Sequence, residues 1–191
     1  HLAIDVFERS GWTLLLSDLY QQGFNPCLGA ENSLLPDQNA YPGVATLQSK
    51  ALENKALSQD VVVEQQKLMA ADPVILQFPL WWGSMPAMLK GWVDRVLVRG
   101  FAYGGQFELA NKLLLLSVTT GGAANQKEEA YYLDKVKGIS GDIFAYMKMQ
   151  CLEPFICHGP ANIGAEQRKA ELDRYLTKLQ VDIARFSSAA I

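Results

Sequence analysis

Two kinds of apolar pattern alternate along this chain of 191 residues. Short runs that are apolar at nearly every position predict strands buried on both faces. Longer stretches with apolar residues three or four positions apart predict helices. The predicted strands are 12–18, 73–78, 112–118 and 151–157. The predicted helices are 1–9, 59–71, 128–136, 141–150 and 165–186, and one more helix begins at Pro86, a favoured first position for proline.

The order of these elements predicts the fold class. Strands alternate with helices, and the central strands lack the alternation of apolar and polar residues that a one-sided sheet shows. The run KLLLLSV (112–118) is the clearest example. We therefore expect an α/β fold in which helices cover both faces of a parallel sheet. Ligands of such sheets bind beyond the carboxyl ends of the strands. The segments after 73–78 and 112–118 are therefore the candidate ligand-binding loops.

Two segments with complementary chemistry follow those strands. PLWWGS (79–84) carries Trp81 and Trp82 in a loop, where large indoles gain little from burial. They either fill a gap in a core or interface, or form a wall for a flat apolar ligand. TTGGAANQ (119–126) is either an ordinary turn or a set of donors for a heterocycle edge or an anion. Together, a stacking wall and a hydrogen-bonding loop suit a flat ring with a polar edge, such as isoalloxazine.

Composition excludes several classes of function. Hydrophobic residues make up 49% and charged residues 19%, an ordinary globular mixture, and the net charge is −3 with both signs dispersed. The chain has no basic patch of the kind that binds nucleic acid. No apolar run approaches the roughly 18 residues of a membrane span, so the protein is not expected to be membrane-embedded. Cys27, Cys151 and Cys157 lack metal-site or redox spacing, which indicates free thiols in a reducing cytoplasm and no metal site.

The run QFPLWWGSMPAMLKGWVDRVLVRGFAYG (77–104) resembles the signature of the NAD(P)H:quinone oxidoreductases, flavoproteins with a flavodoxin-like fold. Shorter segments match the same family in the same order: SDLYQQGFNP (17–26), TTGG (119–122) and LEPF (152–155). The resemblance implies one flavodoxin-like domain over 1–191, a doubly wound parallel sheet with strand order 2-1-3-4-5. It also implies a strand and a phosphate-binding loop before His1, so that the domain is N-terminally incomplete.

The resemblance further implies a flavin, FAD or FMN, with NAD(P)H as hydride donor and a quinone as acceptor in a ping-pong reaction. Tyr103 would reach across a homodimer interface to wall the neighbouring subunit's site. Tyr131 or Tyr132 would hydrogen-bond the flavin pyrimidine. The cofactor-binding residues would be Pro79, Leu80, Trp81, Trp82, Gly83, Thr119, Thr120, Gly121 and Gly122.

The chain departs from the family pattern at two positions. Gly83 stands where the family often has an aromatic residue, which indicates a drifted loop, a wider substrate pocket or a backbone conformation closed to other residues. Ser140 of GISGD stands where animal-type enzymes have a histidine, and serine cannot become a cation near neutral pH. A tyrosine–histidine relay is therefore in doubt. His158 follows the last predicted strand, and we expect it to be structural.

Rival functions fit less well. A response-regulator receiver needs an aspartate where this chain has QFPL, and electron-carrier flavodoxins are strongly acidic. A flavin-binding regulatory subunit of a membrane transporter remains an alternative. For the homodimer we expect an interface around residues 86–98 and 99–104 with Trp92 and Phe101 as aromatic contacts, although Trp92 suits the monomer core equally.

Overall fold

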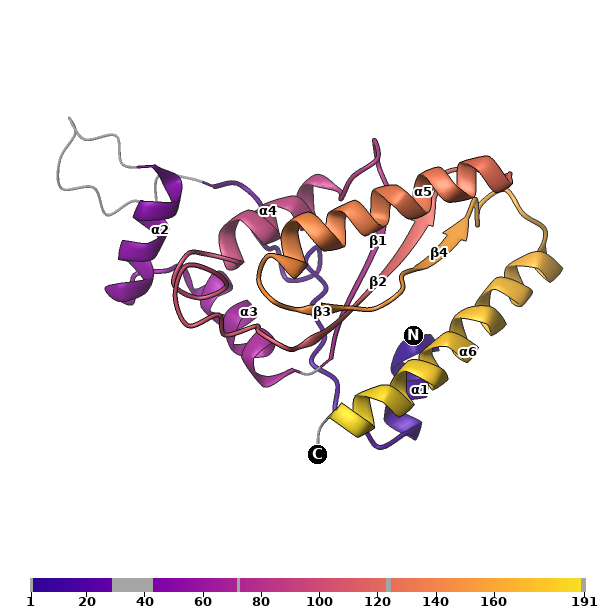
Figure 1. Cartoon of the computed structure of the whole chain (residues 1–191), viewed down its shortest axis with the longest axis horizontal. Coiled ribbons are helices and arrows are strands. Elements are labelled where there is room, and N and C mark those ends of the chain that lie inside the picture. Colours follow the sequence, from indigo (N-terminus) through magenta and orange to yellow (C-terminus); the bar gives the residue numbers. More distant parts are fainter. Residues whose placement is uncertain (1, 29–42, 72, 123–124, 190–191) are drawn as a thin grey trace.

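The computed structural model describes residues 2–28, 43–71, 73–122 and 125–189 (Figure 1). Within these ranges no helix is long and apolar enough to cross a membrane. The helices and strands, in chain order, are α1 (Leu2–Arg9), α2 (Val44–Glu53), α3 (Gln59–Ala70), β1 (Val74–Pro79), α4 (Ala87–Val96), β2 (Leu113–Thr120), α5 (Gln126–Ile139), the π-helix η2 (Ser140–Ala145), β3 (Gln150–Cys151), β4 (Phe155–His158) and α6 (Ala165–Ala189).

The sheet is parallel and β2 lies at its centre, which confirms the predicted fold class. β1 pairs with one edge of β2, from Val74 opposite Leu114 to Pro79 opposite Thr119. β3 and β4 both pair with the other edge, and His158 lies opposite Thr120. These neighbours agree with the last three strands of the expected order, and the remainder of that order stays a prediction.

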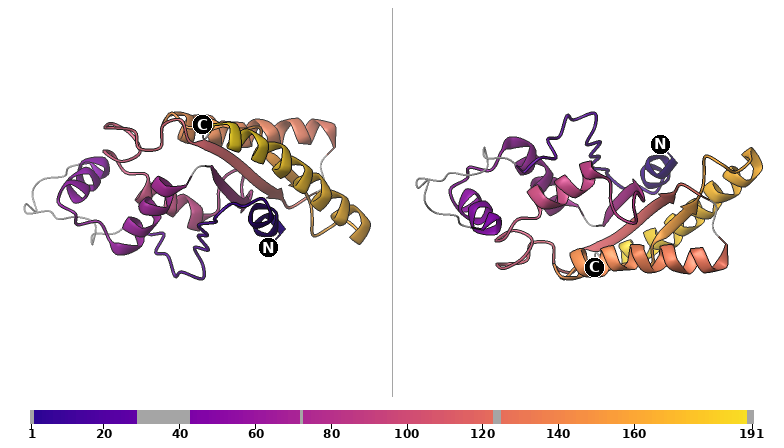
Figure 2. Two further views of the ribbon diagram at one scale, coloured as in Figure 1. Left: turned by 90° about the horizontal axis from the view of Figure 1, so that it is seen from below. Right: turned by 90° about the horizontal axis from the view of Figure 1, so that it is seen from above.

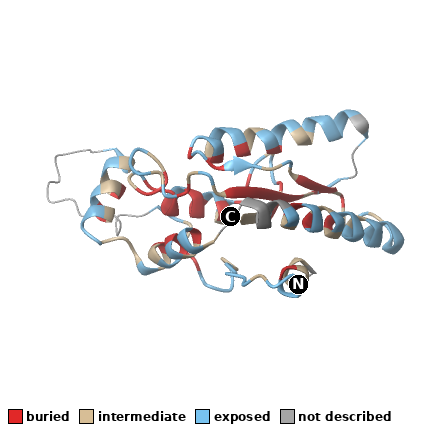
Figure 3. Ribbon diagram, turned by 60° about the horizontal axis from the view of Figure 1, so that its bottom comes forward, coloured by how far each residue is buried: buried red, intermediate tan, exposed pale blue. Residues whose placement is uncertain are grey.

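Helices cover both faces of the sheet, because β2 is apolar on both sides. Leu114 and Leu116 face a core shared with α3, α4 and α5, whereas Leu113 and Leu115 face a second core shared with α1 and α6. Figure 3 shows β2 as a buried strand between α5 and α6, and Figure 2 shows α1 beside α6. Fully burying each leucine stabilises the fold by about 1.5–3 kcal/mol. This double coverage leaves the strand ends as the open part of the sheet.

The strand predicted at 12–18 is wrong, because these residues form no strand. A strand is defined by its ladder of hydrogen bonds, and no described strand pairs with this segment. Leu14, Leu15 and Leu16 are exposed, so the segment also lacks the burial that its apolar run led us to expect.

The strand predicted at 151–157 is divided in two. β3 ends at Cys151, the amide of Leu152 still donates to the carbonyl of Leu114 (2.8 Å), and β4 begins at Phe155. Pro154 lies in the break, where its missing N–H costs no ladder bond.

The two helices predicted at 128–136 and 141–150 are one continuous element, α5 followed by η2. Ser140 lies at the junction, buried, and its hydroxyl donates to the carbonyls of Val136 (3.3 Å) and Lys137 (2.9 Å). Serine hydroxyls that bond back onto the preceding turn bend a helix, and π-turns often accompany such irregularities. Ser140 is therefore a structural residue of the helix.

Trp92 belongs to the core of the single chain. Its indole is buried, and Nε1 donates to Oε2 of Glu64 at 2.9 Å. The buried Glu64 carboxylate also accepts from Ser17 Oγ (3.0 Å) and Lys67 Nζ (2.8 Å), which offsets the cost of burying its charge. Phe101 is buried in the same core. The prediction that Trp92 and Phe101 supply aromatic contacts to a dimer interface is therefore wrong.

Candidate functional site at the carboxyl edge of the sheet

Three loops meet beyond the carboxyl ends of β1, β2 and β4. The amide of Leu80 donates to the carbonyl of Thr119 at 2.7 Å, which joins the first loop to the second. The amide of Gly159 donates to the carbonyl of Thr120 at 3.1 Å, and Asn162 Nδ2 donates to the carbonyl of Gly121 at 2.7 Å. The structure thus brings together the two predicted segments and adds a third, residues 158–162.

The tryptophan loop is a tight hairpin. Trp81 and Ser84 exchange both of their backbone hydrogen bonds, each 3.0 Å long. The two central residues, Trp82 and Gly83, have φ of 52° and 70°. Positive φ at both central positions is the type I′ pattern, and a bulky aromatic residue there stores strain of about 1–3 kcal/mol. Trp81 is 55% exposed and Trp82 is fully exposed at 105%, so the interpretation that they fill the core is wrong.

Gly83 has the restricted backbone that one of the three sequence interpretations expected, and it also has open space around it. Its positive φ disfavours any residue with a Cβ, yet a Cβ built there meets no atom within 4 Å. Leu80 is buried, and its amide donates to the carbonyl of Thr119. Pro79, the last residue of β1, lies opposite Thr119 and sets the spacing between the two loops.

The glycine segment that follows β2 exposes its backbone. Gly121 and Gly122 are exposed, and a Cβ on either would meet nothing within 4 Å. Thr120 is buried, and its hydroxyl donates to the carbonyl of Gly122 at 2.9 Å, which bends the chain after the strand. The arrangement leaves room for a ligand to approach the glycine backbone closely.

Sequence reasoning missed two residues of the third loop, His158 and Asn162. His158 Nδ1 lies 3.1 Å from Thr120 Oγ1. Burial lowers the pKa of His158, and Arg174 acts in the same direction, while Glu129 and Glu171 oppose the shift. The imidazole is therefore predominantly neutral near pH 7. The rule that ligands bind at carboxyl ends would have identified His158, since it ends β4 as Thr120 ends β2.

The two candidate tyrosines of α5 have different surroundings. The ring of Tyr132 lies 5.4 Å from the ring of His158, centroid to centroid, and faces the core. Tyr131 is 53% exposed and packs edge-on against Tyr132, while Lys135 Nζ lies 5.4 Å from its ring centroid. Of the two, only Tyr132 contacts a residue of the carboxyl edge.

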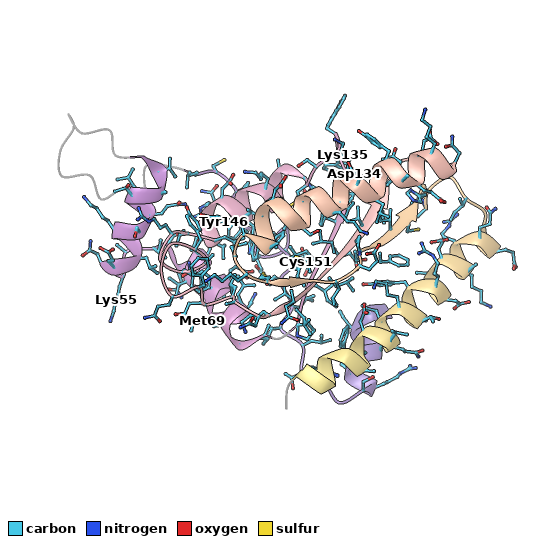
Figure 4. All side chains as sticks on the ribbon, in the orientation of Figure 1. Lys55, Met69, Asp134, Lys135, Tyr146 and Cys151 are labelled. Carbon is cyan, nitrogen blue, oxygen red and sulfur yellow. The ribbon has the colours of Figure 1, made fainter. Side chains whose placement is uncertain are left out.

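Tyr103 and Ser140 lie away from this edge. The ring of Tyr103 packs 5.8 Å from that of Tyr146, and both line a cavity of about 400 Å³ between α2, α4 and η2. The carbonyl of Ser140 accepts from Cys151 Sγ at 3.5 Å. Figure 4 shows Tyr146 and Cys151 toward the C-terminal end of α5, whereas the loops follow the opposite ends of the strands. Ser140 therefore takes no part in this site within the chain.

Among the described residues, no group of three or more histidines, cysteines, aspartates and glutamates could hold a metal ion. Cys27, Cys151 and Cys157 are free thiols. Burial raises the pKa of Cys157, so this thiol, although next to His158 in the sequence, stays protonated near neutral pH. The carboxyl edge presents exposed indoles and an open glycine backbone.

Comparisons with known proteins agree with this geometry. Residues 2–181 match the Flavodoxin_2 family, described as having a flavodoxin-like fold. The chain is 38% identical to the ribosyldihydronicotinamide dehydrogenase [quinone] of Mus musculus, over 94% of this chain and 82% of the relative. It is 36% identical to NAD(P)H dehydrogenase [quinone] 1 of Rattus norvegicus, over 93% of this chain and 69% of the relative.

A solved structure of a quinone reductase is also similar to this chain. The crystal structure of a candidate quinone reductase from Klebsiella pneumoniae superimposes with a TM-score of 0.84 and 30% identity, covering 94% of this chain and 76% of that one. The parallel sheet, the position of the loops and these relatives lead to one assignment: the chain belongs to the NAD(P)H:quinone oxidoreductases of flavodoxin-like fold, a family of oxidoreductases.

Proposed function

We propose that the protein binds a flavin at the carboxyl edge of its sheet and reduces quinones with NAD(P)H as hydride donor. The observation that carries this proposal is the pairing of an exposed tryptophan hairpin with an open glycine backbone, joined through the Leu80–Thr119 hydrogen bond of 2.7 Å. Aromatic faces suit a planar ring, and backbone amides suit its polar edge. The residues therefore fit the cofactor that the family implies.

Each loop has a separate task in this proposal. Pro79 to Gly83 would lie along the flavin ring, and Thr119 to Gly122 would hold its polar edge. A bound flavin supplies the redox chemistry, since it can exchange two electrons with both nicotinamides and quinones. The protein's contribution is to hold each flat substrate in contact range at the exposed indoles and to provide donors where negative charge develops. NAD(P)H and quinone would occupy the same space in turn, which is the ping-pong order.

Among the tyrosines we propose Tyr132 as the one that contacts the cofactor, because its ring packs on His158. Tyr131, exposed on the outer side of α5, is the weaker candidate. Whether the flavin is FAD or FMN follows from its release and identification by mass.

The test of the function uses the full-length protein. We expect it to carry or take up a flavin, seen in the visible absorption bands, and to oxidise NADH or NADPH only when a quinone is present. Initial rates at several fixed quinone concentrations should give parallel double-reciprocal lines, as ping-pong kinetics require. A protein that stays colourless after incubation with FAD and with FMN would refute the proposal.

We also propose a homodimer. Tyr103 lies far from the loops of its own chain and, with Tyr146, lines the cavity described above. It can therefore wall a carboxyl-edge site only on a second copy. Sedimentation at micromolar concentration should give twice the chain mass, and a species of single-chain mass would contradict the dimer.

A further inference from the structure

His158 is joined to the glycine segment through a single hydroxyl group. Thr120 Oγ1 carries one hydrogen, and it donates this hydrogen to the carbonyl of Gly122 at 2.9 Å. The contact of 3.1 Å between Oγ1 and His158 Nδ1 must then have the imidazole as donor. This fixes the neutral tautomer: Nδ1 carries the proton, and no described residue hydrogen-bonds Nε2.

The third loop thus restrains the second at two points. His158 acts on Gly122 through Thr120, and Asn162 holds the carbonyl of Gly121 at 2.7 Å. Because Thr120 is buried while both glycines are exposed, the restraint is applied from inside and leaves the outer side of the backbone open. Tyr132, packed on the imidazole ring, limits how far His158 can turn.

We propose that His158 is a positioning residue of the flavin-binding loop: through the Nδ1–Thr120–Gly122 chain of hydrogen bonds, it holds residues 120–122 in the conformation that binds the polar edge of the flavin. The inference rests on the proposed function. It differs from the sequence expectation, in which His158 was only part of the fold. A hydrogen bond of this kind contributes about 1 kcal/mol, or roughly fivefold in affinity.

Three variants separate the hydrogen bond from the packing of the ring. His158→Phe keeps an aromatic ring on Tyr132 but removes the donor, and we expect flavin to bind about fivefold more weakly. His158→Asn loses the ring, yet its amide N–H stands at the same number of bonds from the backbone as Nδ1–H, so affinity should return to that of the wild type. Thr120→Val removes both hydrogen bonds of the chain, so it should weaken binding at least as much as His158→Phe, and the double variant should lose no more than Thr120→Val alone.

Dissociation constants for FAD and FMN, from quenching of flavin fluorescence by the apo full-length protein, are the measurement. Equal affinity in the wild type and His158→Phe, or equal loss in the Phe and Asn variants, overturns the inference and leaves the proposed function intact. Failure of the wild type to bind either flavin overturns the proposed function and the inference together. If His158→Phe does not fold, Thr120→Val compared with Thr120→Ser, which keeps the hydroxyl, decides in the same way.

Discussion

Replacing Arg95 by methionine is expected to lower the free energy of unfolding by about 3 kcal/mol, the largest effect of any single change considered. The guanidinium is almost fully buried. Nη1 lies 2.6 Å from Asp60 Oδ2 and also donates to the carbonyl of Asn25, and Nη2 donates to Ser58 Oγ at 2.8 Å. Methionine keeps the length and the apolar stem of the side chain. The expected loss of stability therefore comes from the hydrogen-bonding groups that the guanidinium leaves without a partner.

The control for this prediction lies on the same helix. Lys90 and Asp94 form an exposed pair of 2.5 Å, and Lys90→Met should cost less than about 1 kcal/mol. Urea unfolding of the two variants beside the wild type gives the comparison. A loss as small for Arg95→Met as for Lys90→Met would show that the buried network does not stabilise the fold.

The same network predicts a pH dependence. Burial tends to raise the pKa of Asp60, but hydrogen bonds from Arg95 and Ser58 and the charge of Arg95 outweigh it and lower the pKa. The contribution of Asp60 to stability is therefore fully present above its ordinary value of 3.8 and is lost as the pH falls through the lowered folded value. In Arg95→Met the share of this acid dependence that comes from Arg95 should disappear.

Gly83→Phe is expected to reduce kcat/KM for bulky quinones by roughly 10- to 200-fold relative to small ones, because the ring would fill space over the proposed flavin site. A Cβ at this position meets nothing within 4 Å, so the side chain would project into open space. The positive φ of 70° adds a second, separate effect. Any L side chain there strains the turn by about 1–2 kcal/mol.

Two further variants distinguish these effects. Gly83→Ala strains the turn without filling the space, so it should weaken flavin binding as Gly83→Phe does but leave the ratio between large and small quinones unchanged. Gly83→Asn should weaken binding least, because asparagine tolerates the left-handed conformation. If Ala and Phe lose flavin equally and neither discriminates by size, Gly83 serves the turn alone and the pocket interpretation is wrong.

Those parts of the fold that depend on local patterns could be predicted from the sequence. β2 is apolar on both faces, and this pattern together with the alternation of strands and helices predicted a parallel sheet and the edge where its loops meet. The prediction of a strand at 12–18 was wrong because a strand also needs a neighbouring strand to pair with, and a local apolar pattern does not show whether one is present. Pro154 did not by itself indicate that the strand predicted at 151–157 is divided, because a proline also occurs at the end of an unbroken strand.

In the candidate site, the exposure of the glycine backbone could be predicted from the sequence, whereas contacts between side chains of distant segments could not. The exposed glycines follow from TTGG itself. The contact between His158 and Thr120 depends on the register of β4 beside β2, which no single segment encodes. Ser140 is a similar case: GISGD indicated only that serine replaces the family histidine and puts the relay in doubt, while the course of α5 places Ser140 at its junction with η2, away from the carboxyl-edge loops.

The left-handed conformation of Trp82 sets a limit on how this protein can evolve greater thermal stability. A single substitution of Trp82 by glycine or asparagine would relieve the strained backbone and raise the free energy of unfolding. That step removes the exposed indole. Under the proposed function, stability and activity therefore oppose each other at this turn, and a search for heat-resistant variants should find substitutions at position 82 that raise the free energy of unfolding and lower quinone reduction.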